Sequence, residues 1–366
     1  MMEKQKLRTG KILTFAGAVI AFTIGSGFAT GQEILQYFTS YSYKSVLVVL
    51  VFMAVFIYTN YSFSKAGADG KFTKGSEVFP YFCGKTVGLI YDVFAVVFCF
   101  LSFIVMVSGA AATFNEQYGL PLIVGGLILT VTACATVIFG LNAIVDVLGK
   151  VGPAIVIICI LIGLVTVVRD GGNIASGAAL LASGEVKVMQ ASTNWFFSGC
   201  SYAGFCMLWF ATFMSELGAK NNLKEVSVGM ILGTVAVAVA ILLMSFALLA
   251  NIGAVAGTQI PSLVLAGKIH PMLTTLFALV IFGGIYTTAV PLLWTSVSRF
   301  TVEKSKKFKI LTIILSFAGF IISMTLPFNK LVNIVYVLNG YGGILLIFFM
   351  LFKDIKSARA GKKFIE

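Results

Sequence analysis

The sequence predicts an all-α polytopic membrane protein with about ten transmembrane helices. Of its 366 residues, 59% are hydrophobic and 11% are charged. Apolar runs long enough to cross a bilayer recur along the chain, and a soluble core of this length needs no such runs. The net charge of +12 follows from a positive-inside bias, so it does not indicate a nucleic-acid partner. Only five of the 26 lysines and arginines fall outside the expected cytoplasmic segments and their borders: Lys44, Arg169, Lys187, Lys268 and Lys330.

The chain is expected to form one transmembrane domain over residues 1–366, with cytoplasmic tails at 1–10 and 353–366. Its first apolar run is too long for a cleavable signal peptide and lacks a small-residue cleavage site, so it is predicted to be the first span. Ten spans place both termini in the cytoplasm, in a protein of the cell membrane. The spans are predicted at residues 11–38, 45–64, 86–113, 121–139, 143–168, 194–216, 226–249, 271–299, 309–326 and 331–352.

The first span carries a stretch that a simple membrane anchor would not need. Gly25, Gly27 and Gly31 lie close together in its middle, and the ionisable Glu33 follows them. Glycine loses more conformational freedom than any other residue when it is ordered, so a helix is easily interrupted here. Unwound backbone inside a membrane leaves amide and carbonyl groups without partners, which is costly unless a polar partner is present. We expect a small ligand to be that partner.

The sixth span carries a second stretch of small and polar residues, from Ser198 to Gly204. Because the first and sixth spans are five spans apart, the second half of the chain would enter the membrane from the opposite side. This is the inverted repeat of many secondary transporters, in which the substrate lies between two broken helices. The sequence therefore predicts one repeat over residues 11–168 and another over 194–352, with helices 1 and 6 broken.

Three motifs resemble those of LeuT-fold transporters of the amino acid–polyamine–cation superfamily. Ile24-Gly25-Ser26-Gly27-Phe28 resembles the glycine-rich break of their first helix. Trp195-Phe196-Phe197-Ser198 resembles the approach to the break of their sixth helix, and the segment from Ser215 to Lys224 resembles the loop that follows. The stretch from Gly25 to Glu33 is most similar to bacterial YkvI-type membrane proteins. The resemblance implies a LeuT-like fold of five plus five helices and transport by alternating access.

The two predicted breaks suit a zwitterionic amino acid. A helix half that begins after Gly27 presents amide N–H groups and the positive end of a dipole, which favour a carboxylate. Helix halves that end near Ile24 and Ser198 present carbonyl oxygens, which favour an ammonium group or Na⁺. Phe197 is expected to close over the ligand, whereas the serines and the cysteine are equally consistent with helix packing. The candidate substrate-binding residues are Gly25, Ser26, Gly27, Phe197, Ser198, Cys200, Ser201 and Tyr202.

A second candidate site is the run from Gly284 to Thr288 in the eighth span. In sodium-coupled LeuT-fold transporters, carbonyls of the first and eighth helices and a hydroxyl pair hold one Na⁺. The resemblance carries these roles to Ala21, Ile24, Gly284, Thr287 and Thr288. The alternative is that both threonine hydroxyls bond back to a carbonyl one turn earlier. The resemblance implies Na⁺ as the coupling ion, and no cofactor is expected.

Two ionisable residues make a proton the alternative coupling ion. Glu33 lies about two turns beyond the break, where an ionisable residue is expected to be a proton carrier, an outer gate or a partner for a cationic substrate. It is also consistent with a buried carboxyl group bonded to neighbouring helices. Lys150 lies in the fifth span, where a lysine takes the sodium position in some proton-linked or sodium-independent relatives. Its side chain is equally consistent with snorkelling to the cytoplasmic interface beside Asp146.

The sequence therefore predicts a secondary active transporter of a small amino acid or related zwitterion, coupled to Na⁺. Proton-coupled or exchange transport is one alternative, and a membrane ligand sensor similar to spore-germinant receptor subunits is another. An enzyme is not expected, because the aqueous loops carry no nucleophile–base pair, metal cluster or phosphate-binding loop. The expected partners are a small-molecule substrate and the lipid bilayer, and the chain is expected to be a monomer or a homodimer.

Overall fold

The computed structural model describes residues 7–70, 72, 75–139 and 145–359, without the side chains of residues 26, 75, 145–154 and 358–359. In this part of the chain, eight helices are long and apolar enough to cross a membrane. They match the second to eighth predicted spans and the tenth. The helices are α4 (Ser45–Gly70), α5 (Val78–Tyr118), α6 (Leu122–Phe139), α7 (Val145–Asp170), α9 (Trp195–Lys220), α10 (Leu223–Ala250), α13 (Pro271–Ser298) and α15 (Phe328–Arg359).

The first and ninth predicted spans complete the set of ten. The first span is divided into α1 (Thr9–Thr23), α2 (Ser26–Thr30) and α3 (Gln32–Tyr37), so the predicted break in this helix is confirmed. The ninth span is α14 (Lys306–Ser323), an apolar helix with lysines in its first turn. The chain therefore forms a multi-pass membrane protein with the predicted helix count.

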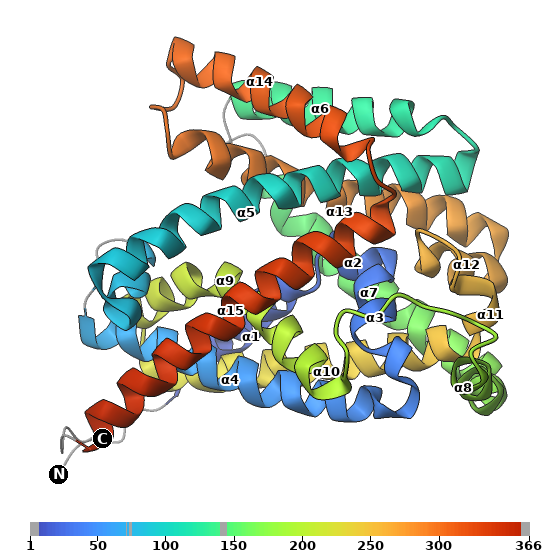
Figure 1. Ribbon diagram of the computed structural model, residues 1–366, viewed down its shortest axis with the longest axis horizontal. Helices are drawn as coiled ribbons and strands as arrows, with labels where there is room; N and C mark the ends of the chain where they lie inside the picture. Colours follow the sequence, from blue (N-terminus) through green and yellow to red (C-terminus); the bar gives the residue numbers. More distant parts are fainter. Residues whose placement is uncertain (1–6, 71, 73–74, 140–144, 360–366) are drawn as a thin grey trace.

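The long helices form one all-helical bundle (Figure 1). Helix α5 crosses the length of the molecule, and α6 and α14 pack along it on one side. Helix α4 packs against α9 and α10 on the other side, and α15 contacts both α5 and α9. The first span lies among these helices, where α1 packs against α10 and α2 against α13.

Short helices in the connections gather at one end of the bundle. Helix α8 (Ile174–Ser183) follows α7, and α11 (Ile252–Val255) and α12 (Pro261–Ile269) connect α10 to α13. Helices α8, α11 and α12 lie at the same end of the molecule in Figure 1. Further single turns are η1 (Thr39–Lys44), η2 (Gly75–Glu77) and η4 (Gly171–Asn173).

Polar side chains fix where several long helices begin. Asn194 and Asn222 accept hydrogen bonds from backbone N–H groups in the first turns of α9 and α10. Ser305 does the same for α14, and His270 accepts from Met272 ahead of α13. Such caps satisfy amide groups that a helix start leaves without a partner. The single histidine of the sequence thus caps a helix start.

The predicted break in the sixth span is wrong. Helix α9 runs without interruption from Trp195 to Lys220. Its glycines serve close packing instead: a Cβ on Gly199 would lie 2.8 Å from the carbonyl oxygen of Val48 in α4. A Cβ on Gly204 would lie 2.3 Å from the carbonyl oxygen of Gly340 in α15. Small residues that let helix backbones approach produce the same sequence pattern as a break.

Ion pairs at the inner end agree with the predicted topology. Arg8, just before α1, donates from Nε and Nη2 to the two carboxylate oxygens of Glu225 at the start of α10, each at 3.0 Å. Arg299, just after α13, pairs with Asp92 of α5. Each pair joins two segments that ten spans place on the same side of the membrane.

Candidate functional site

The first span unwinds at Ile24 and Gly25. Ile24 has φ −86° and ψ 80°, and Gly25 has φ −95° and ψ −164°, so neither residue is helical. A Cβ placed on Gly25 would meet no atom of the described residues within 4 Å, apart from its own neighbours in the chain. Among the described residues, the break therefore leaves open space beside Gly25, the residue that the sequence indicated.

The part of the first span beyond the break, which the predicted topology places toward the outside, is enclosed, whereas the part before the break is not. Every residue from 27 to 40 is buried. Before the break, α1 alternates between buried and exposed positions, and Phe22 is 51% exposed. Among the described residues, neighbouring helices therefore enclose the span beyond the break but leave part of α1 uncovered.

Side-chain amides hold the outer part of the first span to its neighbours. Gln32 donates from Nε2 to the carbonyl oxygen of Thr258, which lies between α11 and α12, at 2.7 Å. Gln36 donates to the carbonyl oxygen of Asn329 in α15 at 2.9 Å, and it accepts from Nδ2 of Asn333 at 3.0 Å. Buried amides make strong hydrogen bonds without the cost of burying a charge. These contacts close the outer side with neutral groups.

Helix α12 rests on the junction between α2 and α3. The Ser262 hydroxyl donates to the carbonyl oxygen of Ala29 at 2.5 Å. Gly31 has φ +84°, and a Cβ on it would lie 3.1 Å from the backbone nitrogen of Ser262. Both the left-handed backbone and this close approach favour glycine. Gly31 therefore serves the outer closure, and the interruption that the ligand is expected to fill lies at Gly25.

Glu33 places a carboxyl group against the glycine-rich stretch. Its side chain is 5% exposed. Its Oε2 accepts a hydrogen bond from the hydroxyl of Tyr202 at 3.2 Å. Its Oε1 lies 1.7 Å from the position that a Cβ on Gly27 would occupy. The ion pairs between described residues do not include Glu33.

The surroundings of this carboxyl group are aromatic and neutral. The ring of Tyr202 lies 5.1 Å from the ring of Tyr37, whose buried hydroxyl lies beside the hydroxyl of Ser201. Cys206 of α9 and Tyr336 of α15 also interact electrostatically with Glu33. These groups donate hydrogen bonds but carry no positive charge. Since an uncompensated buried carboxylate is costly, the site favours uptake of a proton or of a cationic group at Glu33.

Two of the predicted residues of α9 form hydrogen bonds with the first span. Tyr202 does so through Glu33, and the Ser198 hydroxyl donates to the carbonyl oxygen of Tyr37 at 2.7 Å. Both residues are fully buried. They join α9 to α3, beyond the break, so the structure brings them together with Glu33 and Gly27.

The other predicted residues of α9 have different surroundings. Phe197 is 47% exposed in the first turn of α9 and packs against Phe196, so it does not cover the break. Cys200 is partly exposed. Ser201 is buried beside the hydroxyl of Tyr37 in α3, and its hydroxyl oxygen also lies 2.1 Å from the position of a Cβ on Gly340 in α15.

Three of the five predicted sodium ligands lie together in α13. The hydroxyls of Thr287 and Thr288 both donate to the carbonyl oxygen of Gly284 at 2.9 Å. This is the back-bonding expected of threonines in a helix, and each hydroxyl keeps lone pairs for a further contact. On the first span, Ala21 is exposed and Ile24 is buried at the break.

Two candidate side chains lie outside the described set. The backbone of Ser26 begins α2 and that of Lys150 lies in α7, but the side chains of both are among those not described. Elsewhere in the described residues, no group of three His, Cys, Asp or Glu side chains could hold a metal ion. A sodium site built from carbonyl and hydroxyl oxygens requires no such group.

The amide contacts of Gln32, Gln36 and Asn333 were not predicted as a group from the sequence. A signal was present, because Gln32 and Gln36 are four residues apart in an apolar span and therefore share one face of the helix. Asn333 stands in the tenth predicted span as a second amide at membrane depth. What the sequence lacked was the pairing between the two spans.

Two proteins of Bacillus subtilis (strain 168) are similar to the chain, while no protein-family model matches it. The uncharacterized membrane protein YkvI is 23% identical over 363 residues, which is 98% of this chain and 100% of YkvI. The uncharacterized protein YyaD is 32% identical over 117 residues, which is 32% of this chain and 33% of YyaD. The similarity to YyaD thus spans about a third of that protein, whereas the similarity to YkvI spans its whole length.

Solved structures at low sequence identity share the fold. MhsT, solved in complex with L-phenylalanine, has a TM-score of 0.60 at 14% identity, and the match covers 95% of this chain and 89% of MhsT. The inward-facing conformation of Mhp1 has a TM-score of 0.63 at 12% identity, and the match covers 94% of this chain and 78% of Mhp1. A manganese transporter of Eremococcus coleocola has a TM-score of 0.54 at 11% identity, and the match covers 93% of this chain and 78% of the transporter.

These comparisons show a shared fold. Together with the ten spans and the interrupted first helix, they identify its architecture. The chain has the LeuT fold and is similar along its whole length to a YkvI-type membrane protein.

Proposed function

We propose that the chain is a secondary active transporter of a small amino acid or related zwitterion, coupled to Na⁺ and working by alternating access. It would act in the cell membrane with both termini in the cytoplasm. The observation that carries the proposal is the open space that the described residues leave beside the unwound Gly25. The part of the first span that follows, residues 27–40, is buried. Interrupted helices at membrane depth hold the substrate in secondary transporters. The fold shared with MhsT, solved with L-phenylalanine, supports the same conclusion.

The uninterrupted α9 changes the form of the proposed substrate site. Because α9 is continuous at Ser198, it offers no free carbonyl groups there. The main-chain groups of the proposed substrate site therefore come from Ile24 and Gly25. The hydroxyls of Ser198 and Tyr202 stand on the facing helix. The inverted repeat of residues 11–168 and 194–352 now rests on the span count and the fold rather than on paired breaks.

A thermal-shift screen of amino acids and small amines tests this proposal directly. A ligand that binds only the folded protein raises its stability by about 2.7 kcal/mol at a concentration 100 times its Kd. We expect at least one zwitterion to raise the melting temperature, and the same compound to accumulate in proteoliposomes. If no compound raises the melting temperature and none accumulates, the proposed transport of amino acids is wrong.

Replacing both Thr287 and Thr288 by valine tests sodium coupling. Valine keeps the shape of threonine but removes the hydroxyl oxygens. The Na⁺ concentration needed for half-maximal substrate binding should therefore rise at least about tenfold, because each lost polar contact to a charged group costs on the order of 1.5–3 kcal/mol. Thr312→Val in α14 is the matched control, because the Thr312 hydroxyl also bonds back to a carbonyl one turn earlier. Equal substrate binding in Na⁺ and choline buffers in the unmodified protein would exclude the sodium site.

The burial of Glu33 favours proton coupling as the second candidate. The carboxyl group lies against Gly27. Its one hydrogen bond among the described residues is accepted from the hydroxyl of Tyr202. A proton would neutralise the carboxyl group while the outer side is closed. Uptake driven by a pH gradient in the absence of Na⁺ would support this candidate over the sodium site.

Proteoliposome uptake also separates transport from sensing. A ligand sensor would bind the compound that stabilises the protein without moving it across the membrane. Saturable binding together with no accumulation, under both a sodium and a pH gradient, would favour the sensor.

A further inference from the structure

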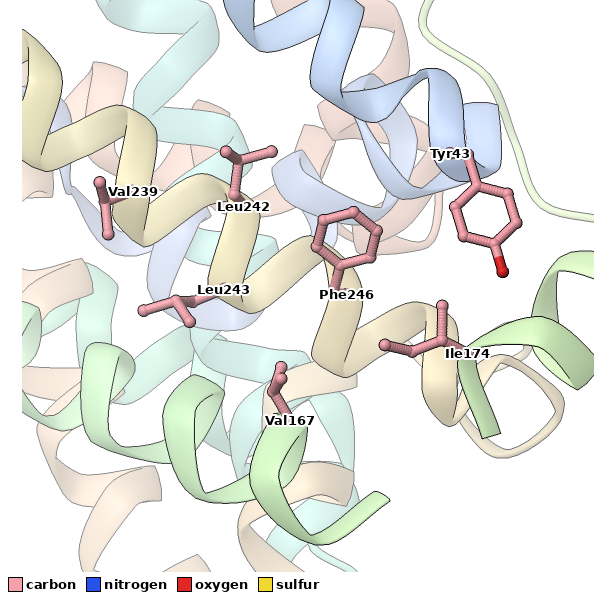
Figure 2. A pocket seen from close by; sticks show the side chains of 7 residues that line it. All are labelled: Tyr43, Val167, Ile174, Val239, Leu242, Leu243 and Phe246. Atoms are coloured by element: carbon pink, nitrogen blue, oxygen red, sulfur yellow. The ribbon is translucent and has the colours of Figure 1, made fainter. Parts of the chain in front are cut away.

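Two hollows adjoin the short helix α8, and different kinds of side chain line them. The first lies between α7, α8 and α10, where the side chains offer a ligand one hydroxyl, that of Tyr43, and no charge (Figure 2). The second, called the α8–α12 pocket below, lies between α8, α11 and α12, where the short helices gather (Figure 1). Its volume of about 280 Å³ is close to the lower limit of about 300 Å³ that is usual for small-molecule sites. Asn173, Ser176, Asn251 and Lys268 are its polar lining residues, so the pocket suits a small polar compound.

Hydrogen bonds hold Lys268 at this pocket. The buried side chain of Asn251 accepts from Nζ of Lys268 at 2.5 Å. Its Nδ2 donates to Oδ2 of Asp170 at 3.0 Å and to the carbonyl oxygen of Ala247 at 3.1 Å. In addition, Nη1 of Arg169 donates to the carbonyl oxygen of Lys268 at 2.5 Å. These contacts join the ends of α7, α10 and α12, so the ammonium group has a defined place beside the pocket.

The charges in this group of contacts do not cancel. Asp170 faces Arg169, whose Nε lies 3.8 Å from its Oδ1. The ion pairs between described residues do not include Lys268. An ammonium group has three N–H donors, and Asn251 accepts from one of those of Lys268. Arg169, Asp170 and Lys268 together therefore carry one net positive charge, and Lys268 keeps N–H donors for a ligand.

Helix α8 contributes uncharged polar groups to the same pocket. Asn173 directly precedes α8 but does not cap it with its side chain, and Ser176 lies in the first turn. Both residues are exposed. Close packing fixes the position of this helix, because a Cβ on Gly177 would lie 1.9 Å from the carbonyl oxygen of Leu249 in α10. The pocket therefore has hydrogen-bonding groups on a wall that is packed tightly against the bundle.

We propose that the α8–α12 pocket binds a small organic carboxylate with a single negative charge. The carboxylate contacts Nζ of Lys268 together with Asn173 and Ser176, and a short carbon chain lies on Leu180 and Ile252. Ammonium, amide and hydroxyl groups donate to a carboxylate, and hydrogen bonds between charged groups are the strong ones. The net positive charge favours an anion over a zwitterion, because the cations repel the ammonium group of a zwitterion. The pocket shares no residue with the break in the first span, so it is separate from the proposed substrate site.

Saturation-transfer NMR titrations of the full chain test the proposal, with propionate and its neutral analogue propionamide as probes. We expect propionate to bind more tightly than propionamide, and alanine, which adds an ammonium group to propionate, not to displace it. Lys268→Gln should weaken propionate binding at least about tenfold, because a hydrogen bond between charged groups is lost. The control is Lys187→Gln, which removes the same charge at an exposed position after α8 that does not line the pocket.

A second pair of variants blocks the pocket and leaves its charges in place. Ser176→Trp fills the pocket from an exposed position of α8 and should abolish propionate binding. Ala175→Trp, at the adjacent exposed position outside the lining, should leave binding unchanged. Size-exclusion profiles and melting temperatures establish that each variant is folded. The proposal is overturned if propionate binds no better than propionamide, if alanine displaces propionate, if the two lysine variants behave alike, or if Ser176→Trp still binds propionate.

Discussion

Replacing Gly27 by alanine is expected to abolish uptake and to destabilise the protein by about 1–3 kcal/mol, the usual cost of overpacking a buried site. A Cβ at this position would lie 1.7 Å from Oε1 of Glu33 and 2.6 Å from its carboxyl carbon. Glu33 is 5% exposed, so its carboxyl group has little room to withdraw. The outer part of the first span would have to shift, and with it the closed arrangement beside the break. Thermal unfolding and proteoliposome uptake measure the two effects.

Gly17→Ala in α1 is the matched control for Gly27→Ala, because a Cβ there meets no atom of the described residues within 4 Å. Alanine is also the better helix former, so the stability of this variant should be unchanged or higher. A double variant then identifies the cause. Adding Glu33→Ala to Gly27→Ala removes the three atoms nearest to the new methyl group, so the melting temperature should recover. If it does not, the contact with Glu33 is not the reason why position 27 requires glycine.

The helix count could be read from the sequence because bilayer thickness alone dictates it. Apolar runs of the right length are local features, and each of the ten predicted ranges overlaps a helix or a set of helices. The break at Gly25 was equally local, since adjacent small residues in an apolar helix weaken it. Gly199 and Gly204 gave the same signal in α9, yet they lie against backbone carbonyls of α4 and α15. Whether a glycine opens a helix or lets a neighbour approach depends on that neighbour, which the local sequence does not contain.

The candidate site shows the same limit. Glu33 and Tyr202 were each noticed as polar groups in apolar spans, but they are 169 positions apart in the chain, and only the fold shows that they share a hydrogen bond. Gly284, Thr287 and Thr288 are close in sequence, and their grouping on one helix turn followed directly from their spacing. Phe197 was assigned by resemblance to a motif that assumes a broken sixth helix, and in a continuous α9 it faces outward.

Replacing Glu33 by glutamine is expected to remove the pH dependence of uptake while preserving the fold. Glutamine has nearly the same shape as glutamate, and its amide can still accept the hydrogen bond from Tyr202. It carries no charge, so the buried site no longer needs a proton or a cation for compensation. The melting temperature should therefore stay the same or rise, and uptake should become independent of an imposed pH gradient. Uptake and thermal unfolding across a pH series measure both properties.

The Tyr202→Phe variant separates a role of the carboxyl group in coupling from a role in packing. It leaves Glu33 ionisable but removes its recorded donor, at a cost on the order of 1 kcal/mol. A coupling role requires that Tyr202→Phe keep a pH-dependent uptake, with its midpoint displaced, while Glu33→Gln has none. If both variants instead lose the same stability and keep the pH profile of the unmodified protein, Glu33 only joins α3 to α9. The ion that drives transport would then have to be sought at Gly284, Thr287 and Thr288, where oxygens without a charge already stand together.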